Sequence, residues 1–137
     1  MGKILDRLKN NQLPTNADKN VLDKIDAFAT EVEAFANSIG GGVSCVRERG
    51  FTVSYGQEWR VVLYKLLPAG GGNTMNYSQI LFRVYVPLIP FQSQPVRFDL
   101  DYEEMVLCGT LDEVEQELEK FAGLPQTAET IQYLANK

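Results

Sequence analysis

Residues 80–86 read Ile-Leu-Phe-Arg-Val-Tyr-Val, and this stretch decides what kind of fold the chain adopts. Successive side chains of a β-strand point to opposite faces of the sheet, so residues two apart share a face. One face would then carry Ile80, Phe82, Val84 and Val86, and the other Leu81, Arg83 and Tyr85. The pattern predicts a core strand with one wholly apolar face and one amphipathic face.

An amphipathic helix is predicted upstream of this strand, with Thr15 or Asn16 as its cap and Ile39 as its last apolar residue. Its apolar positions recur every three or four residues, at Leu22, Ile25, Phe28, Ala29, Val32, Phe35, Ala36 and Ile39. Three glycines at 40–42 end it, because glycine tolerates the left-handed conformation at a helix exit. An apolar stripe of this width must cover a large flat surface, for which a sheet is the best candidate.

The remaining strands follow from the same period of two. We expect strands at 43–49 and 51–55 around Gly50, then a turn at 56–58 into a strand at 59–67, and a further strand at 96–102. Residues 105–108 either extend that last strand past a bulge or form a short strand of their own. The glycine-rich segment 68–73 is interpreted as a hairpin loop, because it lacks the Gly-Lys-Ser/Thr ending and the helix of a phosphate-binding loop.

Two helices are expected near the C-terminus. The sequence Thr110-Leu111-Asp112-Glu113 is a capping box that starts the first, and the second covers about residues 127–135. The chain of 137 residues has the size of one domain. We therefore predict a single α+β domain over 1–137, with a five-stranded antiparallel sheet, a long N-terminal helix on one face, two C-terminal helices, and an N-terminal arm at 3–14.

The composition excludes several kinds of active site. The chain has no histidine and only two cysteines, Cys45 and Cys108, so it can build neither an imidazole-based nucleophile nor a zinc site with histidine or four thiolates. Both cysteines lie in apolar runs, which predicts buried thiols rather than a redox pair. We expect no catalytic residue, no cofactor and no metal.

Charge and hydropathy narrow the possible partners. The net charge is −5, and the 13 basic residues are scattered, which argues against nucleic acid. No apolar run is long enough for a signal peptide or a membrane span, so we expect a cytoplasmic protein without membrane contact. The arm carries Ile4, Leu5 and Leu8, which we expect to pack on the domain rather than on a membrane.

Three carboxylates share one side of the strand predicted at 96–102 and its continuation: Asp99, Asp101 and Glu103. Their oxygens suit Mg²⁺ or Ca²⁺, but one row of side chains cannot surround an ion without a loop. Charged residues are also a common means of preventing pairing at a sheet edge. The edge interpretation is favoured, and the ion-binding alternative stays open.

The candidate binding face consists of arginines and tyrosines opposite the main apolar rows: Arg60, Tyr64, Arg83, Tyr85 and Arg97. Arginine and tyrosine are enriched at interaction hot spots. The ordinary alternative is a solvated face on which the arginines pair across strands with Asp99 and Asp101.

Two functions are compatible with these features. The first is a non-enzymatic interaction or adaptor domain that uses the Arg/Tyr face for a protein partner or for self-association. The alternative is a small module for an anionic ligand, or a weakly specified enzyme, with a pocket between helix and sheet and the ligand held by Arg60, Arg83 or Arg97. An enzyme is less favoured, because no nucleophile has a candidate base nearby.

The layout resembles an uncharacterised family of small cyanobacterial proteins, classed as a domain of unknown function. The resemblance rests on the long helix ending at Gly40-Gly41-Gly42, the strand at 59–67, the strand end Arg83-Val84-Tyr85-Val86-Pro87 and the acidic C-terminal helix. It implies an α+β fold and a cyanobacterial or plastid-related setting. It implies no activity and no functional residues.

Overall fold

The fold is an antiparallel sheet with helices on one side. A computed structural model describes residues 2–10, 17–88, 90–92, 94–100 and 105–137. Its elements are α1 (Gly2–Asn10), α2 (Ala17–Ile39), β1 (Val43–Thr52), β2 (Gln57–Ala69), β3 (Asn73–Val86), β4 (Val96–Leu100), β5 (Val106–Cys108), α3 (Leu111–Ala122) and α4 (Pro125–Ala135). The strands follow the order β1-β2-β3-β4-β5 and every neighbouring pair is antiparallel, which confirms the predicted α+β class.

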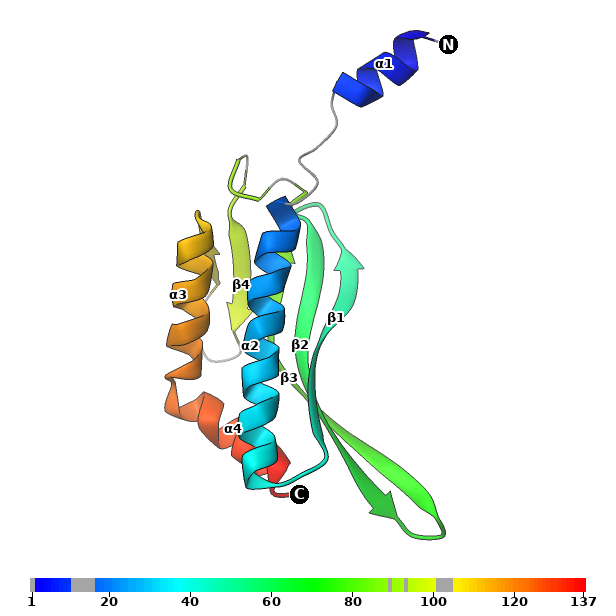
Figure 1. Cartoon of the computed structure of the whole chain (residues 1–137), viewed down its shortest axis with the longest axis vertical. Coiled ribbons are helices and arrows are strands. Elements are labelled where there is room, and N and C mark those ends of the chain that lie inside the picture. Colours follow the sequence, from blue (N-terminus) through cyan, green and yellow to red (C-terminus); the bar gives the residue numbers. More distant parts are fainter. Residues whose placement is uncertain (1, 11–16, 89, 93, 101–104) are drawn as a thin grey trace.

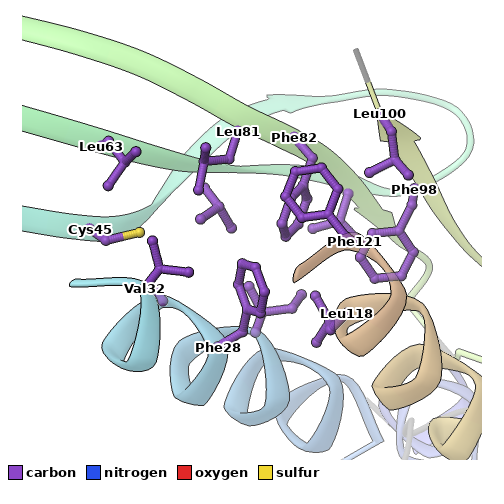
Figure 2. Packing of buried hydrophobic residues seen from close by; sticks show 14 of the residues in the cluster. Phe28, Val32, Cys45, Leu63, Leu81, Phe82, Phe98, Leu100, Leu118 and Phe121 are labelled. Carbon is purple, nitrogen blue, oxygen red and sulfur yellow. The ribbon is translucent and has the colours of Figure 1, made fainter. Parts of the chain in front are cut away.

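The hydrophobic core lies between this sheet and the layer formed by α2, α3 and α4 (Figure 1). Four phenylalanines form its centre, and Phe82 of β3 contacts the other three (Figure 2). The ring centroid of Phe82 lies 5.6 Å from that of Phe28, 5.6 Å from Phe98 and 5.1 Å from Phe121. Strand β3, which contains residues 80–86, is therefore the strand whose side chains join the sheet to the helix layer.

The strict alternation predicted for residues 80–86 is wrong at Ile80 and Leu81. Val61 of β2 faces Phe82 and the next residue, Val62, faces Ile80, so Leu81 is an extra residue in β3. This bulge points Leu81 and Phe82 into the same core, where both are buried (Figure 2), and places Ile80 with Val62 on the other face. A bulge of this kind is invisible in a pattern of uniformly apolar residues, because either phase of the alternation looks plausible.

A second bulge corrects the prediction of two strands around Gly50. Strand β1 is continuous to Thr52, and its register with β2 shifts between Arg49 and Thr52. A side chain at Gly50 would overlap the carboxylate of Glu58, so this glycine makes room for a neighbouring strand's side chain. The turn lies at 53–56, closed by hydrogen bonds between Val53 and Gly56 of 2.9 and 3.1 Å, and not at 56–58.

The C-terminal elements follow the prediction with small shifts. The amide of Glu113 donates to Thr110 Oγ1 at 3.1 Å, which confirms the N-cap of α3, and the Glu113 carboxylate accepts from the amide of Gly109 at 2.6 Å. Helix α4 begins at Pro125, two residues before the predicted start. Residues 106–108 form a separate strand, β5, paired with β4.

The N-terminal arm contains α1, whose apolar residues were expected to pack on the domain. Ile4 is 77% exposed and Leu5 49% exposed, so the structure does not show this packing for the two. Among the described residues, no helix has both the length and the apolar character that crossing a membrane requires.

Candidate functional site

The sheet face that points away from α2, α3 and α4 carries the predicted Arg/Tyr cluster. Arg60 of β2 lies opposite Arg83 of β3, Arg83 lies opposite Asp99 of β4, and Tyr85 lies opposite Arg97. Tyr64 is four residues after Arg60 on β2 and so shares its face. We call this surface the open face, and its polar members are Glu48, Glu58, Arg60, Tyr64, Arg83, Tyr85, Arg97 and Asp99.

Glu58 is the centre of a hydrogen-bonded network on the open face. It is only 6% exposed, and its two carboxylate oxygens accept from Arg60 Nε at 2.6 Å and from the Tyr85 hydroxyl at 3.1 Å. Burial, together with the hydrogen bond to Glu58, raises the pKa of Tyr85. A buried carboxylate needs such partners, because an unpaired charge out of water is costly. The guanidinium of Arg60 is therefore committed within the chain.

A second hydroxyl and carboxylate pair lies on the same face. The Tyr64 hydroxyl donates to the Glu48 carboxylate, and this hydrogen bond is the main cause that raises the pKa of Tyr64. Because Glu48 lies opposite Arg60 across β1 and β2, its negative charge also faces the arginine row. Tyr64 thus has a partner within the fold as well.

Arg97 is committed to Asp99 on its own strand. Its Nε and Nη2 donate to the two carboxylate oxygens of Asp99 at 3.0 and 3.1 Å, and its guanidinium lies 5.0 Å from the ring centroid of Tyr85. The hydrogen bond to Asp99 raises the pKa of Arg97. The expected pairing with Asp99 therefore occurs, but along β4 rather than across strands, while Asp101 lies outside the described residues.

Arg83 differs from the other two arginines of the face. It is partly buried, it lies between Arg60 and Asp99, and both oxygens of Asp99 are bound by Arg97. Within the described part of the chain, no carboxylate pairs with Arg83. The N–H donors of its guanidinium therefore have no carboxylate acceptor among the described residues.

Exposed apolar side chains accompany this arginine on the open face: Val46, Phe51, Leu66 and Leu107. Phe51 is 70% exposed and its ring lies 5.5 Å from the Arg60 guanidinium carbon. Sequence reasoning missed Phe51, because the bulge after Gly50 changes the face on which the residue lies. A glycine directly before an aromatic residue in a strand was the available signal.

Arg47 and Lys65 have structural roles on the helix side. Arg47 binds Asp26 of α2 through two hydrogen bonds of 2.7 and 3.0 Å and lies 4.2 Å from the ring centroid of Trp59. The buried Lys65 donates to the carbonyl of Ala135 at 2.8 Å, at the end of α4, where a cation is favoured by the helix dipole. Neither side chain belongs to the open face.

A cleft of about 590 Å³ lies between the start of α2, the turn at 53–56 and the end of β3. Its lining includes Leu22, Arg49, Tyr55, Trp59 and Pro87. None of Arg60, Arg83 and Arg97 lines it. The anionic-ligand hypothesis required these arginines in a pocket between helix and sheet, and the geometry does not bring them there.

Of the three carboxylates in the predicted ion-binding row, Asp99 is the one within the described residues. Asp101 and Glu103 lie outside the described residues, and Asp99 is bound to Arg97. Over the described ranges, no group of three or more acidic or cysteine side chains is placed to hold a metal ion.

Both cysteines are free and buried in the core, as predicted. Burial raises the pKa of Cys45 to about 12 and that of Cys108 to about 11. Because only the thiolate reacts, we expect Ellman's reagent at pH 8 to modify both thiols at least about a hundred times more slowly in the native protein than in denaturant. Rapid native modification of either cysteine would contradict this burial.

Comparisons with models of known protein families, with curated proteins and with solved structures found no match for this chain. The resemblance to a cyanobacterial family is therefore still an expectation.

Proposed function

We propose that this chain is a non-enzymatic interaction domain that binds a protein partner through the open face. The observation that carries the proposal is Arg83, a partly buried guanidinium without a carboxylate partner among the described residues, on the same sheet face as exposed apolar side chains. Desolvated arginines among apolar residues are typical of the centres of protein interfaces. The complementary partner surface would supply a carboxylate for Arg83 and apolar side chains for Phe51 and Leu66.

The rest of the network supports the same function by holding the face rigid. Glu58 fixes Arg60 and Tyr85, and Asp99 fixes Arg97, so these long side chains already occupy defined positions before any partner arrives. Binding then costs less conformational entropy than it would with free side chains. A sheet surface also suits a protein better than a small ligand, because small-molecule sites are concave.

The substitution Arg83→Glu tests this proposal. It would place a carboxylate opposite Asp99 and against an acidic partner surface, and we expect binding to weaken by about 30-fold or more, as for loss of one member of a desolvated charge pair. The measurement is partner capture in cells of the source organism, with a photo-crosslinking amino acid at exposed Leu107 on the open face. The substituted domain should retain its circular dichroism spectrum.

Two controls make this test specific. Lys19→Glu makes the same change of charge at an exposed position of α2 and should leave capture intact. A crosslinker at exposed Gln132 of α4, within the helix layer, should not capture the same partner. Equal capture by the Arg83→Glu and wild-type chains, or equal capture from Leu107 and Gln132, would show that the open face is not the binding surface.

A further inference from the structure

Over the described residues, strand β3 has a long edge with which no other strand pairs. It pairs with β2 along its length, but with β4 only from Phe82 to Tyr85. Residues 73–80 have no strand on their other side within the described part of the chain. In an antiparallel strand alternate residues turn their N–H and C=O groups away from the neighbour, so this edge presents a row of free donors and acceptors.

The tip of the β2 and β3 hairpin extends past the helices as a two-stranded arm (Figure 1). Strand β1 pairs with β2 only as far as Lys65, so within the described sheet residues 66–69 and 73–76 pair only with each other. Leu66 and Met75 of the arm are 58% and 47% exposed. An isolated two-stranded ribbon is marginally stable in water, and further strands would stabilise it.

The two outer edges of the sheet are protected by other means. On β1, the Asn37 side chain exchanges two hydrogen bonds of 2.9 Å with the backbone of Val43, and Glu33 accepts from the amide of Cys45 at 2.9 Å. The side chains of α2 thus occupy backbone groups that another strand would need. On the opposite edge, β5 has only three residues. Short strands and covered edges are the usual protection against unwanted pairing.

At the free edge of β3 one such contact lies at the end of the segment, where the Gln79 side chain donates to the carbonyl of Ile80 at 3.1 Å. The composition of the strand itself suits self-pairing. Residues 66–82 contain no Asp, Glu, Lys or Arg. In a twofold contact each residue near the axis faces its own copy, so any charge there would repel itself. A strand without charge favours a second copy of this chain. The charges beside it come from α4 and its end and are of both signs: Lys137 Nζ lies 4.5 Å from the ring centroid of Tyr77, and Glu129 lines the same hollow as Tyr77.

We propose that two copies of this chain associate through residues 73–80 of β3, antiparallel to each other, and join their sheets into one continuous sheet. The pairing gives the free N–H and C=O groups partners and adds strands to both arms. A twofold axis perpendicular to the sheet keeps both open faces on the same side. The interface is separate from Arg83, so this inference does not depend on the proposed partner.

Light scattering coupled to gel filtration tests the pairing. We expect the wild-type chain to have twice its monomer mass of 15.4 kDa, and the double variant Asn76→Lys, Ser78→Lys to have the monomer mass, because lysines repel across the axis. The control Gln116→Lys, Gln132→Lys adds the same charge at exposed positions of α3 and α4 and should remain dimeric. A wild-type chain that stays monomeric up to about 1 mM would overturn the proposal. A dimer that survives the Asn76 and Ser78 substitutions would also overturn it.

Hydrogen exchange locates the interface. Amides within residues 73–80 should exchange more slowly at concentrations where the dimer forms than at dilution, whereas those of β1 should not change. Concentration-independent exchange at 73–80 in a dimeric sample would overturn the pairing. Arg83→Glu should leave the dimer intact, because Arg83 lies outside residues 73–80. The variant Asn76→Lys, Ser78→Lys keeps Arg83 in place. Failure of this inference and failure of the proposed function can therefore be told apart.

Discussion

Replacing Phe82 by alanine is expected to lower the free energy of unfolding by about 3–5 kcal/mol, the range for removing a buried aromatic side chain. Phe82 is 1% exposed and its ring contacts Phe28 of α2, Phe98 of β4 and Phe121 of α3. The substitution therefore leaves a cavity where three other elements meet β3, and no single neighbour can move to fill it. Besides the lost burial, the aromatic contacts themselves contribute to the cost.

Urea denaturation followed by circular dichroism measures this loss, with Phe51→Ala as the matched control. Phe51 is the same residue type but is largely exposed, so its substitution should change stability by no more than about 0.5 kcal/mol. A loss below about 1 kcal/mol for Phe82→Ala would mean that the four-ring cluster is not the centre of the core.

Replacing Arg60 by methionine is expected to cost about 3 kcal/mol of unfolding free energy, near the lower end for breaking a buried ion pair. The Glu58 side chain is 8% exposed and Arg60 Nε is its cationic partner at 2.6 Å. Methionine preserves the aliphatic length but leaves the buried carboxylate with the Tyr85 hydroxyl as its remaining described partner. The cost arises mainly from the carboxylate that is left without its positive charge.

Two further variants check this explanation. Adding Glu58→Gln to Arg60→Met removes the buried charge and should recover part of the lost stability. Arg97→Met breaks a more exposed pair, with side chains 33% and 30% exposed, and should cost no more than about 1 kcal/mol. If Arg60→Met lowers the free energy of unfolding no more than Arg97→Met does, the burial of Glu58 is not the reason why the pair stabilises the fold.

Arg60 and Arg83 of the open face differ in how strongly the fold depends on them. Reversing the charge of Arg60 would put a second carboxylate beside Glu58, so any loss of binding would be confounded with loss of the fold. Arg83 has no such partner among the described residues and can be reversed with less structural damage. It is the most informative single position for testing binding.

Much of the fold follows from patterns that local physical chemistry imposes. The spacing of apolar residues in 17–39 specifies α2, because a helix must bury one stripe of its surface. Thr110 and Glu113 specify the start of α3, because its first amides need acceptors. Alternation in β2, β3 and β4 likewise places Arg60, Arg83 and Arg97 on one face, and these features require no knowledge of distant residues.

The strand Ile-Leu-Phe-Arg-Val-Tyr-Val shows what the sequence by itself determined and what only the tertiary structure decided. Its period of two specified a core strand with Arg83 and Tyr85 turned away from the helices. The bulge at Leu81 and the pairing of Glu58 with Arg60 and Tyr85 depend on the register between β2 and β3. Register is set by packing across strands that are distant in sequence, so local patterns do not contain it. For the same reason, only the tertiary structure distinguishes Arg83, which pairs with no carboxylate among the described residues, from two arginines that the fold itself uses.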